Sequence, residues 1–198
     1  MLRVVTPPEE GGAIRQRVLD ATGRLVERFT YAKMTMEDVA RASGVARQTL
    51  YKHFAGKDDL LVELFIREME EQQHPALDPY RQEPPSAQAF LDLIVAELTM
   101  ARSFGIFREA SEPRIAELLF ASDKLFRCRE AFWFPVLACY ETAGLLRPGL
   151  DHAAIVRWIT YQELWLLSHP EVLSTDLGEQ RRYLDEFVIA ALTTGDRP

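Results

Sequence analysis

The chain has 198 residues, of which 47% are hydrophobic and 27% charged, and its formal net charge is −7. This balance is typical of a globular protein and excludes a disordered or fibrous chain. The longest apolar stretch, residues 131–140, is far short of the roughly 20 residues that span a bilayer, which excludes a transmembrane helix. Because residues 1–8 also lack a secretory signal pattern, we expect a cytoplasmic protein without a membrane partner.

The N-terminal part of the chain begins with a segment rich in helix breakers. Residues 1–12 hold two prolines and two glycines, and they predict a flexible arm. From Ile14 to Phe29, apolar residues then recur at spacings of three and four. This periodicity predicts an amphipathic helix over about residues 13–30.

Two short helices are expected next, joined by a tight turn. Thr35 followed by Asp38 is close to a capping box and predicts a helix over about residues 36–43. Gly44 supplies the positive φ that ends this helix. A third short helix follows through about His53, so the segment is typical of a helix-turn-helix.

Charge is distributed unevenly along the chain. Residues 13–58 hold nine basic and five acidic side chains, a net charge of +4 within a chain whose total is −7. DNA binding needs basic side chains near phosphates, so this asymmetry favours a basic DNA-facing module attached to an acidic body.

The rest of the chain also has helical patterns. A long fourth helix is expected to about Gln73, and the proline-rich segment 74–85 predicts a linker. Beyond it, caps and periodicity predict helices over about residues 86–102, 113–143, 151–168 and 177–193. The predicted fold class is therefore all-α: a three-helix helix-turn-helix domain over residues 13–58 and a larger helical ligand-binding and dimerisation domain over residues 59–198.

The cysteines and histidines do not suggest a disulfide or a metal site. Cys128 and Cys139 lie eleven positions apart within one predicted helix, about 16 Å apart along its axis, so we expect two reduced core thiols. His74, His152 and His169 are scattered near helix ends, where capping or solvent exposure is the simpler interpretation. We expect neither a metal nor a cofactor.

The third predicted helix has one apolar face and one polar face. Leu50 and Phe54 are spaced i, i+4 and point into a small core with Val39 and Val45. The opposite face carries Arg and Gln, which can bond to guanine and adenine edges in a major groove, together with side chains that reach phosphates. The expected DNA-binding residues are Thr35, Ala46, Arg47, Gln48, Thr49, Tyr51, Lys52, His53 and Lys57.

This segment resembles the DNA-binding signature of the TetR (tetracycline-repressor) family. The resemblance covers about residues 13–62, and one departure is Gly56, where the family often has Ser. It implies a recognition helix at about residues 46–52, a homodimer that binds a near-palindromic double-stranded operator, and repression relieved by a ligand. The matching positions are Val39, Ala40, Gly44, Val45, Thr49, Leu50, Tyr51, His53, Phe54, Lys57 and Leu60.

Aromatic residues are frequent in the C-terminal part. The simplest interpretation of each is core packing, but together they suit a pocket between helices for a small, largely apolar effector. The candidate ligand-binding residues are Phe90, Phe104, Phe107, Phe120, Trp133, Phe134, Leu137, Tyr140, Trp158, Tyr161 and Trp165.

The last two predicted helices, about residues 152–168 and 177–193, each carry an apolar stripe. The stripes predict an isologous four-helix interface in a homodimer. The alternative is that both stripes pack inward within one chain. The stripe residues are Ile155, Trp158, Ile159, Gln162, Trp165 and Leu166, with Tyr183, Leu184, Phe187, Val188 and Ala191.

The sequence therefore predicts a regulator of transcription, most simply a repressor in which the fourth helix couples ligand binding to DNA release. The alternatives are an activator-type regulator and a helical small-molecule-binding protein without operator function. An enzyme that uses Glu109, His152 or His169 is disfavoured, because the sequence has no nucleophile elbow, phosphate-cradling glycine loop or His-Glu-x-x-His motif.

Overall fold

The computed structural model describes residues 8–29, 31–103, 113–169 and 176–194. These residues are helical apart from their connections, and the one extended pairing among them is an isolated bridge between Leu146 and Thr193. The predicted all-α class is confirmed. The chain divides into two compact units between Phe65 and Ile66, inside α4 (Lys57–Glu68), whereas the sequence places the boundary after residue 58.

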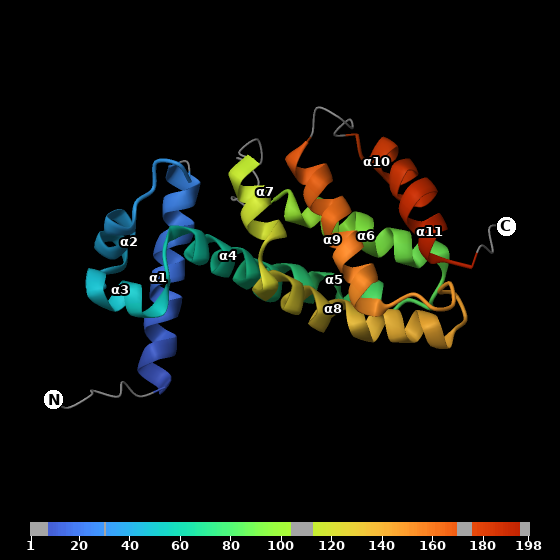
Figure 1. Cartoon of the computed structure of the whole chain (residues 1–198), viewed down its shortest axis with the longest axis horizontal. Coiled ribbons are helices and arrows are strands. Elements are labelled where there is room, and N and C mark those ends of the chain that lie inside the picture. The colour runs from blue at the N-terminus through green and yellow to red at the C-terminus, as the bar shows by residue number, and fades with distance from the viewer. Residues whose placement is uncertain (1–7, 30, 104–112, 170–175, 195–198) are drawn as a thin grey trace. The chain divides into compact units, whose positions relative to one another are not determined.

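The first unit contains α1 (Pro8–Arg28), α2 (Met36–Ser43), α3 (Arg47–His53) and most of α4. Figure 1 shows α2 and α3 on the same side of α1. The helix-turn-helix predicted from the sequence is present with nearly the expected bounds. Its core is apolar and almost fully buried, and it includes Val18, Val39, Val45, Leu50, Phe54, Leu60 and Leu61.

The predicted N-terminal arm is wrong from Pro8 onward, because α1 begins there. A proline is tolerated in the first turn of a helix, where its missing N–H has no helical acceptor. Residues 1–7 lie outside the described residues. At the other end, α1 stops at Arg28, so Phe29 is 43% exposed instead of lying on the buried face.

The connection between α2 and α3 follows the local chemistry of the sequence. The Thr35 hydroxyl accepts from the Asp38 amide at 3.2 Å, and the Asp38 carboxylate accepts from the Thr35 amide at 3.2 Å, which completes the capping box. Gly44 has φ 64°, a left-handed conformation that glycine adopts at low cost. The Val45 amide then donates to the Ala40 carbonyl at 3.2 Å, which closes the turn.

Arg15 of α1 ties the end of α3 to the rest of the first unit. Its guanidinium donates to the His53 carbonyl at 3.0 Å, forms an ion pair with Glu63 of α4, and lies 4.9 Å from the centroid of the Phe54 ring. These contacts hold the last turn of α3 in place and so restrain the helix that carries the outward face.

The second unit consists of the last residues of α4 and the helices that follow. The elements are a π-helical turn at Met69–Gln73, α5 (His74–Arg81), α6 (Ala87–Ala101), α7 (Pro113–Phe120), α8 (Asp123–Thr142), α9 (His152–Ser168), α10 (Leu177–Tyr183), a π-helical segment at Leu184–Ile189 and α11 (Ala190–Leu192).

The predicted linker over residues 74–85 is wrong, because most of it forms α5. Pro75 lies in the first turn, where it is tolerated, and Pro79 lies within the helix. Leu77 is completely buried, and burying such a side chain contributes about 1.5–3 kcal/mol, which helps to offset the hydrogen bond lost at Pro79.

The single helix predicted over residues 113–143 is two helices. α7 ends at Phe120, and the Ser122 hydroxyl accepts from the Leu125 amide at 3.1 Å, so it caps the start of α8. Serine favours such a cap over a helix interior, and this competing signal was missed. The side chains of Ser86 and Asp151 cap the starts of α6 and α9.

The two cysteines lie on α8 in different environments. Cys128 is buried and Cys139 is exposed, so the predicted core position is correct for Cys128 alone. Burial raises the pKa of the Cys128 thiol to about 12, and the nearby Glu70 carboxylate adds to this effect. Both are free thiols, as expected. None of the described helices is long and apolar enough to cross a membrane.

Candidate DNA-binding surface

The polar face of α3 points outward. Arg47, Gln48, Tyr51 and Lys52 are all exposed, with 44% of the Tyr51 surface accessible, while Leu50 of the same helix is fully buried. Of the flanking candidates, Ala46 is exposed, and Thr49 and His53 are half-buried. The structure thus brings the predicted α3 residues together on one surface.

Arg47 has the most defined environment on this surface. Its guanidinium forms an ion pair with Glu37 in the first turn of α2, and its central carbon lies 5.6 Å from the centroid of the Tyr51 ring. The side chain of Arg47 is nevertheless 61% exposed. Sequence reasoning missed Glu37, because it lies ten residues from Arg47 on another helix and no helical periodicity links the two.

The remaining two candidates lie at helix starts and have structural contacts. Thr35 is exposed and caps α2, and the hydrogen bond from its hydroxyl lowers the pKa of Asp38. Lys57 donates to the Tyr31 carbonyl at 3.0 Å, and its ammonium lies 4.2 Å from the centroid of the Tyr31 ring. A phosphate contact by Lys57 would therefore compete with these bonds.

The structure divides the candidate ligand-binding residues into two main groups. Phe90, Trp133, Leu137 and Tyr140 are buried, and the Phe90 ring centroid lies 5.6 Å from that of Trp133 and 4.9 Å from that of Tyr140. Phe104 and Phe107 lie outside the described residues. The others, Phe120, Phe134, Trp158, Tyr161 and Trp165, are half-buried or exposed.

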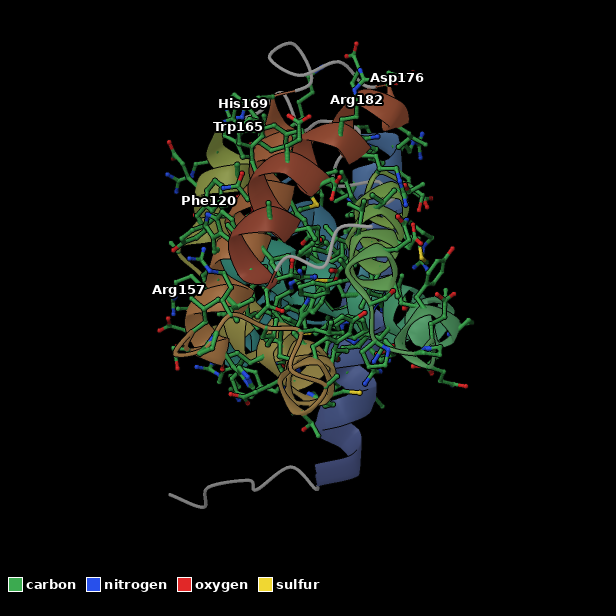
Figure 2. The ribbon with its side chains drawn as sticks, turned by 90° about the vertical axis from the view of Figure 1, so that its right-hand side faces the viewer. Phe120, Arg157, Trp165, His169, Asp176 and Arg182 are labelled. Atoms are coloured by element: carbon green, nitrogen blue, oxygen red, sulfur yellow. The ribbon has the colours of Figure 1, made fainter. Side chains whose placement is uncertain are left out.

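Most of this second group lies along the outer surface of α9. Figure 2 shows Phe120 of α7 along the same edge as Trp165 and Arg157 of α9, with Trp165 above it and Arg157 below. A groove of about 500 Å³ lies here, and a second hollow of about 280 Å³ lies nearer the start of the helix. The groove is lined by Phe120, Tyr161, Gln162, Trp165 and Tyr183, and the hollow by Leu150, Asp151, Ala154, Ile155, Trp158, Ala191 and Leu192.

The histidines have contacts of other kinds. His74 stacks on the Phe132 ring at 4.5 Å, and burial lowers its pKa to about 4. His152 lies 3.2 Å from the Glu141 carboxylate, and the His169 ring lies 3.2 Å from the Trp165 carbonyl. Within the described residues, no three His, Cys, Asp or Glu side chains are grouped to hold a metal ion.

The chain is similar to known regulators of transcription. Residues 18–64 match the family described as bacterial regulatory proteins, tetR family. The HTH-type transcriptional repressor KstR of Rhodococcus jostii strain RHA1 is 35% identical over 89 residues, which span 44% of this chain and 40% of that repressor.

Two solved structures share the fold over most of the chain. The TetR family repressor AlkX from Dietzia sp. has a TM-score of 0.67 at 21% identity and covers 96% of both chains. The transcriptional regulator FadR from Bacillus subtilis, solved with stearoyl-CoA, has a TM-score of 0.61 at 16% identity and covers 89% of this chain and 98% of that one.

The fold and the outward face of α3 define a protein of the helix-turn-helix class, with a larger second unit whose described residues are mainly helical. The match over residues 18–64, the similarity to KstR and the fold shared with AlkX together support a regulator of the TetR family.

Proposed function

We propose that this protein is a homodimeric repressor that binds a near-palindromic operator through α3 and releases it when a small, largely apolar ligand binds the second unit. The observation that carries the proposal is the outward polar face of α3 on a helix whose inner face is fully buried at Leu50. Since operator DNA lies in the bacterial cytoplasm, the proposal places the protein there.

The chemistry of α3 supports binding to a major groove. Arg47 and Gln48 offer donors that match guanine and adenine edges, and Lys52 and Tyr51 can reach phosphates beside them. Thr49 and His53 lie at the margins of the same face. A helix of seven residues braced by Arg15 enters a groove with little rearrangement, so ordering costs on binding are small.

The outer surface of α9 to α11 supports dimerisation, although part of the predicted interface is wrong. Ile155, Ile159, Leu166, Leu184 and Val188 are buried within the single chain, so these members of both stripes pack inward. The outward members are Trp158, Gln162, Trp165, Tyr183, Phe187 and Ala191, and Phe187 is 59% exposed.

An exposed aromatic surface of this kind is unusual on a protein that stays monomeric. A second copy related by a two-fold axis would cover it and would fill the grooves beside Trp165 and Trp158. In this arrangement the aromatic residues along α9 belong to the interface, and the effector site draws on the interior candidates Phe90, Trp133, Leu137 and Tyr140.

The relatives support an apolar effector. FadR was solved with stearoyl-CoA, and AlkX is implicated in the biodegradation of n-alkanes. By linkage, a ligand that lowers the affinity for DNA is itself bound more weakly by the DNA complex, by the same factor.

The direct test measures binding of the full chain to duplexes from the region around its own gene, at low salt, by fluorescence anisotropy. Binding of one dimer to one duplex, and release on adding stearoyl-CoA or hexadecane, would support the proposal. Sedimentation of the protein alone as a monomer would overturn the dimer. If no duplex bound more tightly than unrelated DNA, the regulatory function would be wrong.

A further inference from the structure

Two contacts hold the Arg47 guanidinium in a defined position on the face of α3. Glu37, from the first turn of α2, pairs with one Nη atom, and the Tyr51 ring lies 5.6 Å from the central carbon. Glu37 and Arg47 lie on different helices joined by the turn at Gly44, so this arrangement depends on the tertiary structure of the motif.

The other acidic side chain of the same turn is already engaged. Asp38 accepts from the Thr35 amide at 3.2 Å and pairs with Arg41. Glu37 is 53% exposed and has Arg47 as its partner, so it places a carboxylate on the surface proposed to meet DNA. An exposed ion pair of this kind contributes little to folding stability, so a substitution at Glu37 should leave the fold intact.

A carboxylate at this position has two consequences for DNA binding. It repels phosphates, which lowers the affinity for every duplex regardless of sequence. It also reduces the freedom of Arg47, whose remaining donors can then pair with one base edge in a fixed direction. The first effect is the same for all sites, whereas the second increases the difference in affinity between a correct and an incorrect site.

We propose that Glu37 is a specificity-determining positioning residue, which acts by holding Arg47 for a base edge, and that its charge also lowers the affinity for every duplex. This inference rests on the proposed DNA-binding function. Glu37 then influences the base sequence that the protein prefers, in addition to its overall affinity for DNA.

The test selects bound duplexes from a library with a randomised central segment, using the full chain and sequencing of the bound fraction. The variants are Glu37→Gln, Glu37→Asp, Arg47→Ala and the double variant Glu37→Gln/Arg47→Ala. The position read by Arg47 is the one whose base preference disappears in Arg47→Ala. Glu27→Gln, an exposed acid of α1 in the same unit, is the matched control for loss of one charge.

We expect Glu37→Gln and Glu37→Asp to lose about five- to tenfold of the preference at the position read by Arg47, because neither retains the ion pair at full reach. Glu37→Gln should also bind a fixed unrelated duplex about two- to fivefold more tightly, since one repulsive charge is gone. Glu37→Asp keeps the charge, so it should bind the unrelated duplex as the wild type does. In the Arg47→Ala background, Glu37→Gln should leave base preference unchanged.

Unchanged base preference in both Glu37 variants, with helical content and melting temperature like the wild type, would overturn the inference while leaving the proposed function intact. An equal effect of Glu37→Gln on base preference with and without Arg47 would also overturn it. If the wild-type chain enriched no sequence at all, the proposed function itself would fail, and the inference with it.

Discussion

Arg129 of α8 and Glu163 of α9 form an ion pair inside the second unit, with 2.5 Å between a guanidinium nitrogen and a carboxylate oxygen. Both side chains are more than nine-tenths buried, and Glu97 of α6 pairs with the same guanidinium. Arg129 also donates to the Thr160 hydroxyl at 3.1 Å. Two carboxylates therefore share one buried cation, and burial raises the pKa of Glu163.

Glu163→Gln should remove a pH dependence of stability. A raised pKa means that the folded chain binds the proton of Glu163 more tightly than the unfolded chain does. The stabilisation that this proton gives the folded chain is therefore complete below the ordinary pKa of a glutamate. It declines as pH rises through the raised pKa of Glu163. Glutamine mimics the protonated acid, so we expect urea unfolding between pH 5 and pH 8 to show a smaller decline in the variant. An identical pH profile in both proteins would contradict the raised pKa of Glu163.

Gly44→Ala should destabilise the first unit by about 1–2 kcal/mol, because an alanine at φ 64° suffers the left-handed backbone penalty. No atom lies within 4 Å of the added methyl group, so the cost is in the backbone alone. Gly56→Ala is the matched control: its φ is not positive and its surroundings are also open, so it should be neutral or stabilising. Thermal unfolding followed by circular dichroism compares the two, and an equal effect would contradict this explanation.

Changes on the outward face of α3 should separate specificity from affinity. Arg47→Ala or Gln48→Ala should reduce discrimination between operator variants by about 1–3 kcal/mol. Lys52→Ala should weaken binding to all duplexes alike, and the slope of log affinity against log salt concentration should fall in magnitude by about one. Anisotropy titrations at several salt concentrations measure both quantities. If all three variants bound like the wild type, another surface would have to contact DNA.

Phe187→Asp should dissociate the proposed dimer without unfolding the chain. Phe187 is 59% exposed, so the change removes little from the core of one protomer, but it would place a charge in the interface. We expect dimer affinity to fall by about 2–4 kcal/mol. Sedimentation velocity measures it, with Tyr80→Asp, another exposed aromatic of the second unit, as the control. Equal sedimentation of the Phe187 variant and the wild type would place the interface elsewhere.

The local rules of the chain were sufficient for the helix-turn-helix. The Thr35 cap, the Gly44 turn and the spacing of Leu50 and Phe54 each act within a few residues, so their outcome depends little on the rest of the fold. For that reason the outward position of Arg47 could be predicted before any tertiary contact was known.

Contacts between distant segments decided what the sequence could not. Leu77 is buried in a helix predicted as a linker, because the energy of covering it comes from other helices. Phe90 and Phe187 share the same side-chain chemistry and the same helical periodicity, yet one is buried and the other exposed. Helical spacing specifies which residues share a face, but only the packing of the folded chain determines what covers that face.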